Sequence, residues 1–115
     1  MTDELPCPVC GFKTVEDNYG SYMICEVCNW EDDGVQLANP CSKGGANGYS
    51  LAEAQAKLLK EYPIPVSEVD GIKRSKTWRP LNSREIDEAK SQLSSGPWPN
   101  KGILYESETY WYKNS

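Results

Sequence analysis

Apolar residues recur with a helical period in two stretches of the chain. In residues 51–62 they fall on one face of a helix, at Leu51, Ala54, Leu58 and Leu59. Ser50 and Glu53 form a capping-box pattern at its start, and Pro63 ends it. A second helix is predicted over residues 83–93, with Ile86 and Ala89 on its apolar side.

Shorter alternating stretches predict β-structure on either side of these helices. Residues 5–13 are expected to contain one strand and residues 21–24 another, and the turn-forming residues 18–20 would join them into a hairpin. Residues 103–112 have strand-like composition and end in three adjacent aromatic side chains. We therefore expect a C-terminal strand that completes the core.

Four cysteines stand in two pairs with the spacing of a metal site: Cys7, Cys10, Cys25 and Cys28. Two residues separate the members of each pair, and a doubled C-x₂-C pattern is a strong signal for Zn²⁺. Tetrahedral zinc takes four thiolate ligands at about 2.3 Å. Because the chain has no histidine to replace a thiolate, we predict a structural zinc site made of these four residues.

Other interpretations of the four cysteines stay open. Two disulfides or an iron-binding thiolate set would use the same residues. The first residues lack the basic and apolar segments of a signal peptide, so we expect a cytoplasmic protein, where thiols persist and metals are favoured over disulfides. Gly11 and Asn29 follow the two pairs and tolerate the left-handed backbone that closes such a loop.

The composition limits the possible classes of protein. Hydrophobic residues make up 38% of the chain, and no run approaches the roughly 20 apolar residues of a membrane-spanning helix. We expect a soluble protein whose thin core depends on a bound metal. Four thiolates would leave zinc no open coordination position for water or substrate. The sequence also lacks histidine, a P-loop and paired carboxylates at a defined site, which are common signs of catalysis. We therefore expect no enzymatic activity.

Charge is divided unevenly along the chain. Residues 1–41 hold eight acids and one base, or −7, whereas residues 42–115 hold nine acids and eleven bases, or +2. A zinc ion with four thiolates adds a further charge of about −2 to the first part. This end would repel nucleic acid and attract a basic protein partner. The alternative is that the charge serves only to keep the protein soluble.

The residues after the second cysteine pair are the candidates for binding such a partner: Trp30, Glu31, Asp32 and Asp33. Three acids beside an aromatic ring could receive a lysine or arginine of the partner. The alternative is that Trp30 packs on the metal site and the acids form a solvated turn.

Two further segments carry weaker signals. The glycine-rich residues 39–48 lack a phosphate-binding motif, so we expect a close backbone approach to the metal lobe. Cys41 in this loop has no partner at ligand spacing and is interpreted as an inert thiol.

Basic residues surround Trp78, at Lys73, Arg74, Lys76 and Arg79. They form either a single-strand nucleic-acid site or a solvated loop that offsets the acidic lobe.

Four separate motifs occur in the order typical of the cysteine-rich CPCC family: residues 7–11, 24–36, 39–40 and 44–51. The chain resembles these small bacterial proteins over about residues 5–62. Val9 stands where the family's name has its middle cysteine. That position does not fit the C-x₂-C spacing, so its replacement leaves the predicted metal ligands unchanged. The resemblance implies a zinc-ribbon-like fold and little about activity. Some small bacterial proteins of this type accompany secreted toxins as immunity partners.

These observations predict a small α+β fold: a zinc-ribbon-like β-hairpin lobe, two helices and a C-terminal strand. Residues 1–62 would hold the metal-binding region and first helix, and residues 63–115 would pack on it as one domain. The leading functional hypothesis is a non-enzymatic zinc-binding interaction module. Its sharpest form is an immunity protein that neutralises a basic, nuclease-type toxin. The alternatives are a nucleic-acid-associated zinc ribbon and a redox or metal-handling protein.

Overall fold

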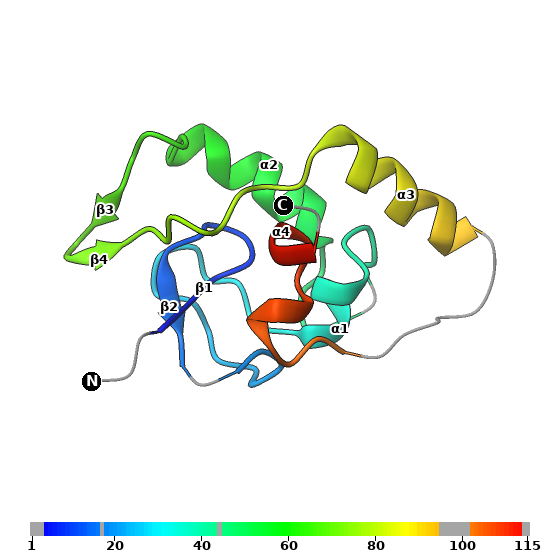
Figure 1. Ribbon diagram of the computed structural model, residues 1–115, viewed down its shortest axis with the longest axis horizontal. Coiled ribbons are helices and arrows are strands. Elements are labelled where there is room, and N and C mark those ends of the chain that lie inside the picture. Colours follow the sequence, from blue (N-terminus) through cyan, green and yellow to red (C-terminus); the bar gives the residue numbers. More distant parts are fainter. Residues whose placement is uncertain (1–3, 17, 44, 95–101, 114–115) are drawn as a thin grey trace.

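The computed structural model describes residues 4–16, 18–43, 45–94 and 102–113. Within these residues, short helices combine with two antiparallel hairpins, as Figure 1 shows. The predicted α+β class is confirmed. In the described part of the chain, no helix has both the length and the apolar character needed to cross a bilayer.

The first hairpin folds around the first cysteine pair. Strand β1 (Leu5–Pro6) pairs with β2 (Lys13–Val15). The predicted pairing with residues 21–24 is wrong, because that segment forms only one isolated bridge, between Ile24 and Glu31. The physical reason is that each C-x₂-C segment is itself a tight turn, so the residues flanking each pair meet one another.

Helix α1 (Gly34–Ala38) was not predicted, because five residues are too few to show a helical period. Helix α2 (Leu51–Glu61) has the predicted capping box and ends at Tyr62, just before Pro63. Its buried face differs in one respect from the prediction. Gln55 is buried, whereas Leu59 is only half-buried.

Residues 63–82 are not wholly irregular as expected. Strands β3 (Glu68–Val69) and β4 (Ile72–Lys73) form a hairpin. Asp70 and Gly71 join them with φ angles of +50° and +84°, which is the positive-φ backbone that an Asp-Gly hairpin turn requires. Helix α3 (Ser83–Ser94) confirms the second predicted helix, with Ala89 buried.

The predicted C-terminal strand is replaced by helical turns: η1 (Glu106–Glu108) and α4 (Tyr110–Lys113). The Glu108 carboxylate accepts hydrogen bonds from the backbone N–H groups of Leu104 and Tyr105 at the start of η1. This local capping favours a helical turn over an extended strand. Of the three aromatic side chains, Trp111 is buried and Tyr112 is exposed, so this tail completes the core through Trp111.

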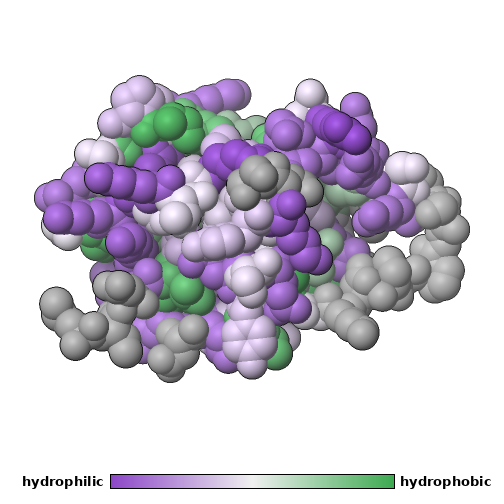
Figure 2. Space-filling view, in the orientation of Figure 1, coloured by the Kyte–Doolittle hydropathy of each residue, from purple (hydrophilic) through white to green (hydrophobic). Residues whose placement is uncertain are grey.

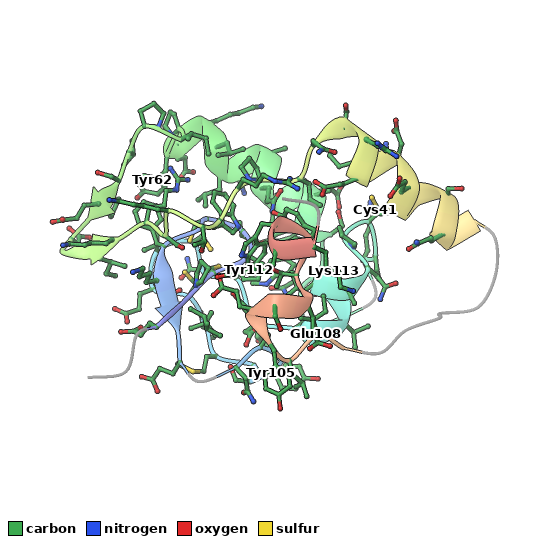
Figure 3. The ribbon with its side chains drawn as sticks, in the orientation of Figure 1. Cys41, Tyr62, Tyr105, Glu108, Tyr112 and Lys113 are labelled. Atoms are coloured by element: carbon green, nitrogen blue, oxygen red, sulfur yellow. The ribbon has the colours of Figure 1, made fainter. Side chains whose placement is uncertain are left out.

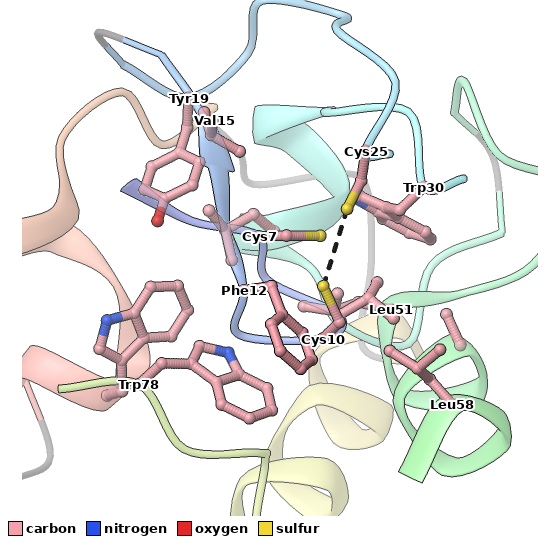
Figure 4. Close-up of a cluster of buried hydrophobic side chains, with 14 residues drawn as sticks. Cys7, Cys10, Phe12, Val15, Tyr19, Cys25, Trp30, Leu51, Leu58 and Trp78 are labelled. Atoms are coloured by element: carbon pink, nitrogen blue, oxygen red, sulfur yellow. Dashed lines mark hydrogen bonds between the residues drawn. The ribbon is translucent and has the colours of Figure 1, made fainter. Parts of the chain in front are cut away.

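The core is built from aromatic and aliphatic side chains around the cysteines, as the close-up in Figure 4 shows. Residues after 62 also join this core. The Trp78 indole N–H donates to the Pro8 carbonyl at 3.1 Å. Gln55 donates to the same carbonyl and to the Tyr110 hydroxyl, each at 2.8 Å. The C-terminal half is therefore tied directly to the first cysteine loop.

Candidate metal centre

Four thiols that are far apart in sequence meet inside the protein: Cys7, Cys10, Cys25 and Cys28. Their sulfur atoms all lie within 4.8 Å of one another. Three of the four residues are buried, and Cys28 is half-buried. Figure 4 shows the Cys7, Cys10 and Cys25 sulfurs directed toward a common point. The structure thus brings together all four predicted ligands.

The sulfur separations distinguish a metal site from disulfides. The Cys7–Cys28 and Cys10–Cys25 sulfur pairs are 3.6 and 3.7 Å apart, whereas a disulfide bond measures about 2.05 Å. A tetrahedron with metal–sulfur bonds of about 2.3 Å has edges of about 3.8 Å. The four thiols therefore fit a tetrahedral metal ion, and all five cysteines of the chain are unbridged.

The two cysteine loops have the same backbone design. The N–H of Gly11 donates to the Cys7 carbonyl at 2.8 Å, and the N–H of Asn29 donates to the Cys25 carbonyl at 2.9 Å. Gly11 and Asn29 have φ angles of +77° and +65°, as predicted. Gly11 has a second constraint, since a Cβ atom there would lie 2.3 Å from the Trp78 ring. Glycine at this position lets Trp78 cover the first loop.

Burial and mutual hydrogen bonding set the protonation of the thiols. Burial raises the pKa of the Cys7 thiol. The pKa of Cys10 is raised chiefly by its hydrogen bond to Cys25, and the pKa of Cys25 is lowered chiefly by the same bond. The Thr14 hydroxyl also donates to the Cys25 sulfur, at 3.1 Å. A divalent cation would replace the protons of Cys7 and Cys10 and offset two of the four thiolate charges.

We expect metal affinity to increase steeply with pH. Because the pKa values of Cys7 and Cys10 are raised, both thiols hold protons at neutral pH when no metal is bound, and an ion must displace them. Each displaced proton contributes about one decade of affinity per pH unit, so affinity should rise at least about a hundredfold per unit between about pH 6 and 8. Competition with a metal indicator at several pH values measures this slope, and a flat profile would contradict it.

Three of the four predicted partner-binding residues are inside the protein. Trp30, Asp32 and Asp33 have exposed fractions of 1%, 1% and 5%. Asp33 caps α1 by accepting from the N–H groups of Val35 and Gln36. Because these side chains are enclosed by the protein's own atoms, a partner would not contact them directly. Trp30 packs in the core beside Cys25, as the alternative interpretation expected (Figure 4).

Asp32 fixes the turn that precedes the second cysteine pair. One of its carboxylate oxygens accepts from the backbone N–H and the hydroxyl of Ser21, at 3.0 and 2.8 Å. The alternative of a solvated turn is therefore wrong for Asp32 and Asp33, whose carboxylates are structural acceptors. Glu31 remains partly exposed.

The glycine-rich loop approaches the metal lobe as expected. Asn47 accepts from the Glu31 N–H at 2.9 Å and donates to the Glu31 carbonyl at 2.8 Å. The half-buried Cys41 lies apart from the four-cysteine cluster, near α3 (Figure 3), with its sulfur 3.6 Å from the Ile86 carbonyl. Burial raises the pKa of the Cys41 thiol. This shift fits the inert thiol inferred from the sequence.

The basic segment does not form an open nucleic-acid surface. Trp78 has an exposed fraction of 6% and Arg74 of 9%, and Arg79 pairs with Glu85 through two bonds of 2.8 Å. A stacking platform requires an accessible ring. The geometry therefore disfavours the nucleic-acid alternative, and it also corrects the solvated-loop interpretation for Arg74.

Arg74 is a site residue that the sequence analysis did not identify. Its guanidinium donates to four backbone carbonyls, those of Cys10, Tyr62, Pro63 and Val66, at 2.7 to 3.1 Å. It also lies over the rings of Phe12 and Trp78, 4.8 and 5.4 Å from their centres. Its position among other basic residues gave no signal that it alone would be buried. Arg74 holds the metal loop against the turn after α2.

Comparison with known protein families gives one match. The family model described as Cysteine-rich CPCC matches residues 5–62, which include all four clustered cysteines, α1 and α2. No curated protein matches the chain.

Proposed function

Since the chain belongs to the cysteine-rich CPCC family, we propose that its four clustered cysteines hold a structural zinc ion in a zinc-ribbon-like lobe, and that the protein is a non-enzymatic interaction module. The observation that carries this proposal is the enclosure of four sulfur atoms within 4.8 Å of one another. Zinc with four thiolate ligands has a filled tetrahedron, so it offers no position for water or substrate. The ion's role is then to stabilise the fold.

A basic protein is the partner that the charge distribution supports. The first 41 residues carry a net −7, and zinc with four thiolates adds about −2. With Asp32 and Asp33 buried, the acids that can meet a partner among the described residues of this part are Glu4, Glu16, Glu26 and Glu31. Surface acids of this kind accelerate association with a positively charged protein.

The sharpest form of this proposal is an immunity protein that neutralises a nuclease-type toxin. The nucleic-acid site of such an enzyme is basic, and an acidic inhibitor can take the place of the phosphates. Charge reversal at Asp33 is a poor test because it would also remove the α1 cap. Glu26 and Glu31 are better positions, since neither accepts a helix-capping hydrogen bond in the described structure.

We expect the protein to inhibit a basic nuclease toxin domain stoichiometrically, and the double variant Glu26→Lys, Glu31→Lys to associate at least about tenfold more slowly at low salt. Nuclease assays and stopped-flow association measure both effects. The matched control is Glu88→Lys, a charge reversal on the exposed side of α3. Lack of inhibition by the unaltered protein would reject the immunity form.

A metal-handling role is the second candidate, and the half-buried Cys28 favours it. This residue lies beside a pocket of about 260 Å³ lined also by Trp30, Lys57 and Leu58. A chelator could reach the ion there. Metal analysis with exchange kinetics separates the two roles. One zinc per chain that exchanges slowly supports the structural role, and exchange within seconds supports metal handling.

A further inference from the structure

Five apolar side chains are exposed near one another on the metal lobe, and we call them the Tyr22 patch: Tyr22, Met23, Ile24, Leu104 and Tyr105. Their exposed fractions run from 37% for Met23 to 62% for Ile24. Three of them are consecutive in the chain. The face in view in Figure 2 is mostly hydrophilic. Contiguous exposed apolar residues that are rimmed by polar ones are typical of protein–protein contact sites.

The two segments of the patch are adjacent although they are about 80 residues apart in sequence. The N–H of Tyr19 donates to the Leu104 carbonyl at 2.8 Å. A Cβ atom on Gly20 would lie 4.0 Å from the Leu104 side chain. Figure 1 shows both segments along the lower edge of the molecule, and Figure 3 labels Tyr105 there. The patch is therefore a joint surface of residues 21–24, before the second cysteine pair, and of residues 104–105, which lead into η1.

The exposure of the first segment is fixed by the buried network beneath it. The backbone N–H of Tyr22 donates to the Asp32 carbonyl at 2.9 Å, and the backbone N–H of Asp32 donates to the Met23 carbonyl at 2.8 Å. Buried Asp32 lies on the inner side of this turn and accepts a hydrogen bond from the hydroxyl of the exposed Ser21. Tyr22 itself has a φ angle of +61°, which an aromatic residue rarely adopts. Strained backbone of this kind is retained mainly at functional sites.

The charged residues within the two segments that form the patch are all acidic. Residues 18–34 contain four acids and residues 102–109 contain two, and neither range contains a lysine or an arginine. The uniform negative charge disfavours a second copy of the chain, nucleic acid and anionic membranes, because each would be repelled. It is complementary to a protein segment that carries apolar side chains among basic ones.

We propose that the Tyr22 patch is the docking surface for the partner, and that the partner presents an apolar ridge flanked by lysine or arginine. This inference rests on the proposed interaction function and specifies its surface. Tyrosine, methionine and isoleucine side chains would supply the apolar contact, and Glu26 and Glu31 would form part of the acidic rim.

An amphipathic helical peptide of lysine and leucine is a suitable probe, with a matched peptide in which serine replaces leucine. We expect the lysine–leucine peptide to shift the amide NMR signals of residues 21–24 and 103–106 most strongly in the zinc-loaded protein. Ile24→Ser should weaken its binding about tenfold. Ile64→Ser is the control, because Ile64 is a similarly exposed isoleucine (52%) outside the patch and should change affinity less than about twofold.

Tyr22→Gly separates a docking role from a folding role. Glycine adopts positive φ freely, so this variant should keep or increase its melting temperature while it binds the peptide about tenfold more weakly. A lower melting temperature with unchanged binding would show that Tyr22 serves folding, and would overturn the proposal.

The remaining outcomes separate this inference from the function on which it rests. If the lysine–leucine peptide binds but Ile24→Ser binds it as well as the unaltered protein, the patch is rejected and the acidic interaction module stands. If neither peptide binds at low salt, both proposals of a basic partner fail. Shifts of the same signals on concentrating the protein alone would identify a second copy as the occupant, and would also overturn the inference.

Discussion

Replacement of Cys10 by serine is expected to abolish metal binding and cooperative unfolding together. Cys10 is fully buried, and a neutral serine hydroxyl is a poor substitute for a thiolate ligand. Structural zinc contributes about 10 to 16 kcal/mol to folding in small domains, whereas a whole domain is stable by only about 5 to 15 kcal/mol. Loss of the ion therefore removes most or all of the stability of this protein.

Circular dichroism melting and elemental metal analysis measure the two effects on the same sample. Cys41→Ser is the matched control, because Cys41 lies outside the cluster. It should keep one metal ion per chain and a melting temperature close to that of the unaltered protein. A strong chelator should reproduce the Cys10→Ser behaviour, and added zinc should reverse it. A stable, cooperatively folded Cys10→Ser variant would show that the metal is not structural.

The cluster of four cysteines was predictable from sequence because metal coordination would fix both residue type and spacing. The same holds for Gly11 and Asn29, whose positive φ angles follow from the loop that a C-x₂-C pair must form. The capping box of α2 was also predictable, since Ser50 and Glu53 are close in sequence. In each case the information is local, and a few neighbouring residues determine the outcome.

The failures concern residues whose role depends on distant parts of the chain. In the sequence, Asp33 has the features of a surface acid. Only the fold shows that it caps α1 and accepts a hydrogen bond from the Ala46 N–H at 2.9 Å. Arg74 is one of several neighbouring basic residues, and only the fold shows that four carbonyls meet at its guanidinium. The aromatic tail was assigned as a strand from its composition, but the described residues form no strand with which it pairs.

Arg74→Met is expected to destabilise the metal-loaded protein by about 3 to 5 kcal/mol. Methionine fills much of the space but leaves the carbonyls of Cys10, Tyr62, Pro63 and Val66 without the donor that now serves them. Burial lowers the pKa of Arg74, while the charge of Cys10 acts in the opposite direction. The guanidinium therefore interacts favourably with a charged Cys10, and the substitution removes this interaction as well.

Arg74→Lys separates charge from geometry. Lysine keeps the positive charge but cannot direct donors at four carbonyls from a planar fork, so it should recover less than half of the loss in melting temperature. Arg84→Ala is the control, because Arg84 is 87% exposed and its only recorded ion pair in the described structure is with Glu88; its melting temperature should change little. Full recovery by lysine would mean that charge alone matters. An unchanged Arg74→Met protein would mean that the turn after α2 is held against the cysteine loop by packing, without help from the guanidinium.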